Sequence, residues 1–247
     1  MKKNLEALFH DIRTFNTVLE NDTILKGLRT RSLGQCEEIE FGEREAMARE
    51  IINNLEKKII PNEYPKFMIN SSEFMMLRGA IIERQGFALV SKKWVEPLAK
   101  WIGNKKCLEI MCGCGSISYA LQQQGVNVIA TDNFSWNGMD SWNTKKNYWT
   151  DIENIDCIEA IRKYGKDIDV IILSWAYMDN YAYQSLIEMR KVNPGTVMLV
   201  IGEGVGGCTA DDDFFETMEV IDNKEIDHID AKYDTWSGLY DHIMLVK

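Results

Sequence analysis

Residues 108–115 of the 247-residue chain read LEIMCGCG, a short apolar run that leads into a turn rich in glycine. The apolar run begins at residue 105 as KKCLEIM, and the residues that follow Gly115, SISYALQQQ, have a helical pattern. In an open α/β sheet, ligands sit at the carboxyl ends of the strands, and glycine lets the backbone approach a ligand closely. Glu109 precedes the glycines, where a carboxylate suits a cationic or hydroxyl-bearing ligand better than a pyrophosphate. Taken alone, the stretch is compatible with a cofactor loop and with an ordinary tight turn.

Strand and helix patterns alternate from this stretch to the end of the chain. The strand patterns are KKCLEIM, VNVIATD, DIDVIILSW and TVMLVIGEG, and the helical patterns are SISYALQQQ, IEAIRKYG, NYAYQSLIEMRKV and DDDFFETMEV. Strands with nearly continuous apolar residues are buried on both faces, which predicts a mainly parallel sheet. EIDHIDA and DHIMLVK are interpreted as two closing strands, joined by KYDTWSGLY, that pair antiparallel at one edge. With a short third strand, the prediction is an α/β fold with a seven-stranded, mostly parallel sheet and an antiparallel C-terminal edge hairpin.

The first hundred residues have helical patterns instead. Apolar residues recur at spacings of three and four along residues 5–19, which indicates one buried helix face. Further helices are predicted over residues 43–59, 71–81 and 92–102, the last capped by Ser91 and ended by Gly103. We therefore divide the chain into a helical N-terminal cap region, residues 1–100, and a sheet-containing domain, residues 101–247.

Composition and charge narrow the classes of function. Lys and Arg number 28 against 38 Asp and Glu, for a net charge of −10, and such a surface repels phosphate backbones, so nucleic acid is an unlikely partner. No apolar run approaches the roughly 20 residues of a membrane span, and the N-terminal segment has an amphipathic helix pattern rather than that of a signal peptide. The six cysteines are therefore expected to be reduced thiols in a cytoplasmic protein. Cys112 and Cys114 lack a second ligand pair at zinc spacing, so no metal is expected.

Asp132 ends the second strand pattern of the domain. An acid at that position can accept hydrogen bonds from both hydroxyls of a ribose. Asp132-Asn133 is also ordinary turn chemistry, so a helix cap or turn residue is the alternative. The glycine loop and Asp132 together favour ribose binding.

Glu109 to Gly115, together with Asp132, resemble the class I, Rossmann-like S-adenosylmethionine-dependent methyltransferases, and the stretch around residues 202–212 is similar to one in an uncharacterised subfamily. The resemblance covers residues 80–247 and implies S-adenosylmethionine as cofactor. It implies that Asp132 holds the ribose, that Asp156 binds the adenine amino group and that Cys157 packs near adenine. Met111 departs from the family, which usually has its first glycine there. The cofactor-binding residues that follow are Glu109, Cys112, Gly113, Gly115, Asp132, Asn133, Asp156, Cys157 and Ser174.

Two further strand ends carry candidates for the methyl acceptor. Ser174-Trp175-Ala176-Tyr177 is similar to the Asn/Asp/Ser-Pro-Pro-Tyr tetrapeptide of amino-group methyltransferases, without either proline, and an apolar strand running into a turn is the alternative. Glu203 follows the fifth strand pattern in a glycine-rich stretch, where a carboxylate can serve as general base or substrate anchor. Tyr177 and Glu203 are the candidate catalytic residues.

Several other residues have a structural interpretation, and some of them also have a functional one. Arg84 and Phe87 either cover the methionine end of the cofactor, as the resemblance implies, or form a salt bridge and a core contact. Thr209 is placed to cap the following helix. The aromatic residues after Asp132 either wall a pocket or fill the space beside a short third strand, and they include Trp136, Trp142, Tyr148 and Trp149.

The sequence therefore predicts an S-adenosylmethionine-dependent methyltransferase that acts on a small-molecule or peptide acceptor. A nucleic-acid amino-group methyltransferase and a non-catalytic cofactor-binding module remain as alternatives. A nicotinamide-dependent enzyme is disfavoured, because the loop lacks the G-x-G-x-x-G spacing.

Overall fold

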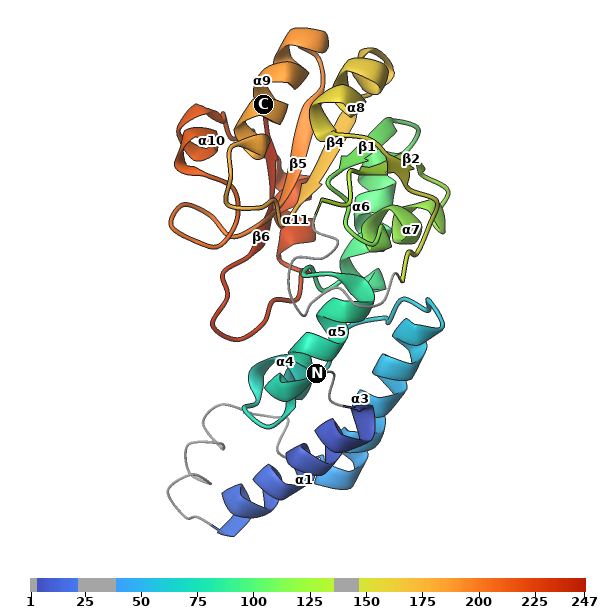
Figure 1. The fold of residues 1–247 in the computed structure, drawn as a ribbon, viewed down its shortest axis with the longest axis vertical. Helices are drawn as coiled ribbons and strands as arrows, with labels where there is room; N and C mark the ends of the chain where they lie inside the picture. Colours follow the sequence, from blue (N-terminus) through green and yellow to red (C-terminus); the bar gives the residue numbers. More distant parts are fainter. Residues whose placement is uncertain (1–3, 22–38, 136–146) are drawn as a thin grey trace.

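A six-stranded sheet in the order β3-β2-β1-β4-β5-β6 forms the centre of the computed structural model, which describes residues 4–21, 39–135 and 147–247 (Figure 1). The strands are β1 (Lys106–Ile110), β2 (Asn127–Asp132), β3 (Glu153–Asn154), β4 (Val170–Ser174), β5 (Val197–Gly202) and β6 (His242–Val246). β1 to β5 pair in parallel, and β6 pairs antiparallel with β5. The α/β class, the mostly parallel sheet and the antiparallel C-terminal edge strand are confirmed, with six strands rather than seven.

The missing strand is the segment interpreted as EIDHIDA, which forms α11 (Lys224–Asp230). Asn223 caps this helix, because its side-chain oxygen accepts the backbone N–H groups of Glu225 and Ile226 at 3.0 and 3.2 Å. Ile226 and Ile229 are three residues apart and both buried, which is the spacing of a helix face. The prediction of a closing hairpin was wrong for this segment. The Asn223 cap and the three-residue spacing of the buried isoleucines favour a helix over the strand-like alternation of apolar and polar residues in EIDHIDA.

Helices cover both faces of the sheet. One face packs against α6 (Lys92–Ile102), α7 (Ser116–Gln122) and α11, and the other packs against α8 (Cys157–Tyr164), α9 (Tyr181–Val192) and α10 (Asp212–Thr217). Along β4, Val170 and Ile172 face the first core and Ile171 and Leu173 face the second. This two-residue period explains why the parallel strands are apolar along their whole length. A short 3-10 turn, η3 (Gly165–Asp167), joins α8 to β4.

The N-terminal helices extend away from the sheet, and α5 leads back to it (Figure 1). They are α1 (Leu5–Asn21), α3 (Phe41–Glu56), α4 (Lys66–Asn70), the 3-10 helix η2 (Phe74–Leu77) and α5 (Arg78–Gln85). The predicted helices over residues 5–19, 43–59 and 92–102 correspond to α1, α3 and α6, and Gly103 ends α6 with a φ of 58°. Ser91 occupies the N-cap position of α6 without a capping hydrogen bond, and the short helix α4 was not predicted.

The N-terminal helices and one face of the sheet share a single hydrophobic core. Phe9, Leu55 and Phe74 belong to the same buried cluster as Trp94 of α6 and Ile172 of β4. Each side chain of this size contributes roughly 1.5–3 kcal/mol when fully buried. In the described part of the chain, no helix has the length and apolar character needed to cross a membrane.

Arg44 of α3 and Glu73 form an ion pair inside the N-terminal helices. Their side chains are 2% and 0% exposed, the Nη1–Oε1 distance is 3.0 Å, and the guanidinium also lies over the rings of Phe41 and Phe74. A charge that loses its partner in such a site is costly, because water cannot replace the carboxylate.

We expect Glu73→Ala to lower the free energy of unfolding by about 3–5 kcal/mol, because it removes the carboxylate that Arg44 contacts in the core. Arg13 is 46% exposed in its pair with Glu45, so Arg13→Ala is the matched control and should cost less than about 1 kcal/mol. Urea unfolding followed by circular dichroism measures both. Equal losses of unfolding free energy in the two variants would show that the buried ion pair contributes no more to stability than the exposed one.

Candidate functional site

The loop after β1 has an unusual backbone. Met111, Gly113 and Gly115 all lie in the left-handed region, with φ values of 51°, 59° and 73°. The Cys112 N–H donates to the Thr131 carbonyl at 3.1 Å, which ties the loop to the end of β2. A non-glycine residue in this region is uncommon. Met111 therefore adopts the conformation that a glycine would favour, at the position where the sequence departs from the family it resembles.

The two glycines of the loop serve different purposes. A Cβ on Gly115 would lie 3.0 Å from the Thr150 Cγ2 atom and 3.2 Å from the Ile152 Cδ1 atom, so Gly115 is required by packing. A Cβ on Gly113 would meet nothing within 4 Å. Gly113 therefore faces open space, and its backbone is the part of the loop that a ligand can approach.

Asp132 stands at the carboxyl end of β2 beside this loop. It is 3% exposed, and its carboxylate accepts the Gly113 N–H and the Phe134 N–H, each at 2.7 Å. The first hydrogen bond crosses from β2 to the β1 loop and holds Gly113 in place. Asn133, the next residue, is exposed, and its side chain accepts the Ser135 N–H at 2.9 Å in a local turn.

Glu109 is buried under the same loop, at 1% exposure. Its carboxylate accepts the Ser118 N–H at 2.9 Å and the Ser118 hydroxyl, so the first turn of α7 is bonded to β1. Burial raises the pKa of Glu109 to about 7, and the charge of Asp132 adds to the rise while the two Ser118 hydrogen bonds oppose it. Glu109 and Asp132 are thus close enough to interact.

Cys112 is close enough to Glu109 and Asp132 for the charges of both to act on its thiol. Burial raises the pKa of Cys112 well above its ordinary value, and the charges of Glu109 and Asp132 raise it further. Burial also raises the pKa of Cys114 to about 12. Both thiols stay protonated at neutral pH, which makes them poor nucleophiles. In the residues that the structure describes, no three His, Cys, Asp or Glu side chains are grouped as metal ligands.

A turn of the N-terminal region crosses the start of α7. The Ser116 hydroxyl donates to the Gln85 carbonyl at 2.6 Å, and the Trp149 indole N–H donates to the Arg84 carbonyl at 2.5 Å. Gly86, with a φ of 96°, lies against the Cys114 sulfur. Residues 84–86 therefore cover this end of the loop with backbone atoms. These contacts have no signal in the sequence, because any residue supplies a carbonyl.

The side chains of Arg84 and Phe87 have other partners. The Arg84 guanidinium contacts the Glu56 carboxylate at 2.5 Å and the Ala80 carbonyl at 2.8 Å, as in the salt-bridge alternative. Phe87 stacks on Trp175, with ring centroids 5.4 Å apart and planes inclined by 23°. Trp175 was missed by sequence reasoning, which took Tyr177 as the aromatic residue of the tetrapeptide.

Asp156 and Cys157 follow β3 at the same edge of the sheet. Asn154 pairs with Asp132 in the ladder, so this segment lies next to the end of β2. The Asp156 side chain accepts the Ile158 N–H at 2.9 Å and caps α8. Cys157 is buried, which raises its pKa to about 11. A helix cap is one function of Asp156, and its contact with adenine stays a prediction.

The fourth strand ends at Ser174, which pairs with Ile201 of β5 and is half-buried. Trp175 then takes a left-handed φ of 49° and donates its backbone N–H to the Ile201 carbonyl at 2.7 Å. Tyr177 is 71% exposed. The bend directs the chain away from the sheet, so Ser174 lies at the strand end and Tyr177 lies on the surface beyond it.

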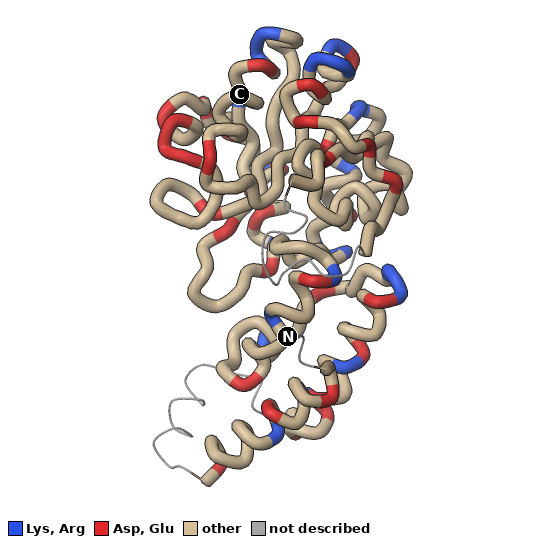
Figure 2. Tube along the Cα trace, viewed as in Figure 1, with Lys and Arg blue, Asp and Glu red and all other residues tan. Residues whose placement is uncertain are grey.

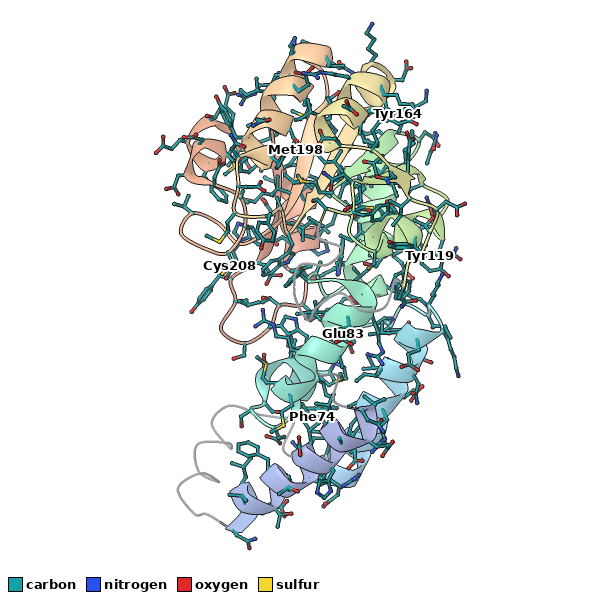
Figure 3. All side chains as sticks on the ribbon, in the orientation of Figure 1. Phe74, Glu83, Tyr119, Tyr164, Met198 and Cys208 are labelled. Carbon is teal, nitrogen blue, oxygen red and sulfur yellow. The ribbon has the colours of Figure 1, made fainter. Side chains whose placement is uncertain are left out.

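Glu203 lies directly after β5 and is 7% exposed. Its carboxylate accepts the Cys208 N–H at 2.9 Å and the Tyr240 N–H at 3.2 Å, which joins the glycine-rich loop to the segment before β6. Burial raises the pKa of Glu203, but these two N–H groups and the charge of Arg78 outweigh it and lower the pKa overall. Cys208, which is labelled in Figure 3, marks this loop.

Two of the predicted side-chain roles near Glu203 differ in the structure. The Thr209 hydroxyl donates to the Glu203 carbonyl at 2.6 Å, so it does not cap the following helix. Asp211 caps α10 instead, since its carboxylate accepts the Phe214 N–H at 3.1 Å. The prediction for Thr209 was wrong because its side chain lies beneath the loop, where Gly202 leaves room for it.

A cavity of about 640 Å³ lies beside α7. Its walls include Tyr119, which Figure 3 labels, together with Phe134, Tyr148 and Trp149. Tyr148 and Trp149 thus line a pocket, which was one of the two interpretations, and Trp149 is also 2% exposed and part of the hydrophobic core. Trp136 and Trp142 lie outside the described residues.

No protein-family model and no curated protein matches the sequence. TehB from Haemophilus influenzae is similar in structure, at 15% identity and a TM-score of 0.41, over 69% of this chain and 66% of that chain. A SAM-dependent methyltransferase from Archaeoglobus fulgidus has 12% identity and a TM-score of 0.37, over 62% of this chain and 94% of that chain.

Magnesium protoporphyrin IX methyltransferase from Synechocystis PCC 6803, whose structure contains bound SAM, has 11% identity and a TM-score of 0.41. The match covers 70% of this chain and 84% of that chain. The strand order and the loop after β1 decide the class of this chain. They define an α/β protein with a Rossmann-like sheet and a glycine loop at the point where the strand order reverses.

The raised pKa of Glu109 predicts a specific dependence of stability on pH. The folded state holds the Glu109 proton up to about pH 7, whereas the unfolded state loses it near 4.5. The stabilisation from this proton is therefore complete below 4.5 and is lost as the pH rises through 7. The shift corresponds to about 3 kcal/mol.

Between about pH 5 and about pH 8, we expect the wild type to lose about 3 kcal/mol of stability relative to Glu109→Gln, which stays neutral. Urea unfolding at several pH values, with both proteins in the same buffers, measures this difference. Parallel stability curves for the two proteins would show that Glu109 does not titrate in this range.

Proposed function

We propose that the chain is a methyltransferase that binds S-adenosylmethionine at the loop after β1. The observation that carries the proposal is the hydrogen bond between the Gly113 N–H and the Asp132 carboxylate, which brings a glycine with open space before it next to an acid at a strand end. This junction lies beside the β1–β4 boundary, where the strand order reverses and ligands of open α/β sheets bind.

The residues at this junction fit the groups of S-adenosylmethionine. Asp132 has a carboxylate at the end of β2, which suits the two neighbouring hydroxyls of a ribose. Gly113 offers a backbone without a side chain, and Asp132 is proposed to provide negative charge for the cationic methionine end. Glu109, whose pKa is raised to about 7, lies under the same loop and is proposed to support it from beneath. Asp156, Cys157, Asn133 and Ser174 belong to the same strand-end edge and are proposed as its adenine- and methionine-side neighbours. A pyrophosphate is disfavoured, because the Asp132 carboxylate would repel it.

S-adenosylmethionine, when bound, supplies a methyl group that its positive sulfur already activates. The chain therefore has to position the acceptor and exclude water, and it needs a base only where the nucleophile arrives protonated. The lowered pKa of Glu203 favours an anchor for a cationic or hydrogen-bond-donating acceptor over a general base at neutral pH. Tyr177 is proposed as the aromatic contact of the acceptor.

The acceptor is proposed to be a small molecule or a peptide. The net charge of −10 opposes a nucleic-acid backbone. Only a methyl-transfer assay separates an enzyme from a module that binds the cofactor without transferring its methyl group. Both alternatives require cofactor binding, so binding is tested first.

We expect saturating S-adenosylhomocysteine to raise the melting temperature of the wild type and NAD to leave it unchanged. A ligand at about 100 times its Kd adds about 2.7 kcal/mol, which is a shift of roughly 5–10 °C for a chain of this size. Asp132→Ala should abolish the shift. Asp167→Ala, an exposed acid in η3 before β4, is the control and should keep it.

Circular dichroism establishes that both variants are folded, and titration calorimetry gives their affinities. Unchanged affinity in a folded Asp132→Ala protein would remove Asp132 from the site. A shift with NAD alone would replace the proposal with a nicotinamide-dependent protein.

A further inference from the structure

Five large apolar side chains are exposed on segments at or beside the carboxyl edge of β4 and β5. We call them the strand-end face, and their exposed fractions range from 41% to 81%: Phe87, Tyr177, Met178, Val205 and Tyr240. Water-exposed apolar groups that are gathered in one place, rather than scattered, usually mark a binding surface. The strand-end face adjoins Ser174, which is proposed above as a neighbour of the cofactor.

The segments that carry the strand-end face are bonded to one another. The Ala210 N–H donates to the Ala176 carbonyl at 3.1 Å, which joins the Val205 loop to the Tyr177 segment. Glu203 joins the same loop to Tyr240, and Phe87 stacks on Trp175, two residues before Tyr177. These contacts hold the segments of the strand-end face in fixed positions relative to one another.

Acidic residues border the strand-end face. In the sequence, Asp179 follows Met178, and Asp211, Asp212 and Asp213 follow the Val205 loop at the start of α10. Figure 2 shows acidic residues in red at α10. The sequence has no Lys or Arg from residue 193 to residue 223. Arg78 of α5 faces Glu203, so the charge of Glu203 is partly balanced, but Asp212 and Asp213 are exposed and form no ion pair with any residue that the structure describes.

We infer that the strand-end face docks a basic polypeptide segment, with apolar or aromatic side chains on Phe87, Tyr177 and Val205 and with Lys or Arg side chains beside Asp179 and Asp211–Asp213. The inference rests on the proposed function, since it names the acceptor-side partner of that site. Charge complementarity selects a cationic partner and speeds its encounter with an acidic protein. The apolar centre and charged border match the usual anatomy of a peptide-binding surface.

The test uses the full chain and two fluorescein-labelled probe peptides, one that alternates lysine with phenylalanine and one with glutamate in place of each lysine. Fluorescence anisotropy should show binding of the lysine peptide, weaker binding at high salt, and no binding of the glutamate peptide. The double variant Asp212→Lys with Asp213→Lys should weaken binding by about tenfold or more. Asp211 is left intact because it caps α10.

The double variant Glu219→Lys with Asp222→Lys is the matched control. It changes the net charge by the same amount, and its residues are exposed near the opposite edge of the sheet, where Glu219 pairs with Lys247 beyond the end of β6. Its affinity should stay within about threefold of the wild type, because only general steering is altered. Val205→Ser tests the apolar part and should weaken the lysine–phenylalanine peptide while leaving a peptide of lysine and glycine unchanged.

Four results would overturn the inference: equal weakening by the two charge variants, no binding of the lysine peptide, tighter binding of a single-stranded DNA probe, or self-association of the chain through this face in sedimentation runs. The assay needs no methyl transfer, and S-adenosylhomocysteine binding is measured separately. Peptide binding without cofactor binding would refute the proposed function, whereas cofactor binding without peptide binding would refute this inference.

Discussion

The hydrogen bond from the Gly113 N–H to the Asp132 carboxylate fixes the geometry on which the site depends. It joins the loop after β1 to the end of β2, and the Phe134 N–H binds the same carboxylate from the other side. Gly113 can donate in this direction because its φ of 59° is open to glycine at no cost. A charged group this deeply buried is stable only when such donors surround it. The loop conformation and the buried acid therefore require each other.

A second constraint ties the helical region to this loop. Arg84 and Gln85 contribute backbone carbonyls to Trp149 and Ser116, so the turn after α5 closes one end of the loop. The hydrophobic core runs without a break from Phe9 to Ile172, which keeps that turn in position. The N-terminal helices are thus part of the body that shapes the site. A helical region with a separate core could move away from the loop freely, but the N-terminal helices share the hydrophobic core of the sheet.

Local patterns predicted the sheet strands and the acids at their ends well, because each depends on a few adjacent residues. Glu109, Asp132 and Asp156 all lie at the strand edge where the sequence assigned them. The closing segment failed, because Ile226 and Ile229 satisfy a helix spacing once Asn223 supplies a cap. Contacts that use backbone atoms, such as the Gln85 carbonyl, carry no residue preference. They follow from tertiary packing and cannot be found in one sequence.

The site has two halves: the loop half, which is the loop after β1 with Asp132, and the strand-end half, which is formed by the segments after β4 and β5. The two halves differ in how strongly they constrain the residue types they contain. The loop half needs a left-handed glycine, a buried acid and a matched donor, so Gly113, Glu109 and Asp132 leave a recognisable pattern. The strand-end half needs only a bend after β4, where Trp175 donates its backbone N–H to the Ile201 carbonyl, and a clamp after β5. The clamp is the Glu203 carboxylate, which accepts the N–H groups of Cys208 and Tyr240. Beyond these two points Tyr177, Val205 and Tyr240 are exposed, so their side chains contribute little to the core. Glu203 is the exception, because the carboxylate that holds this loop is also the one proposed to anchor the acceptor.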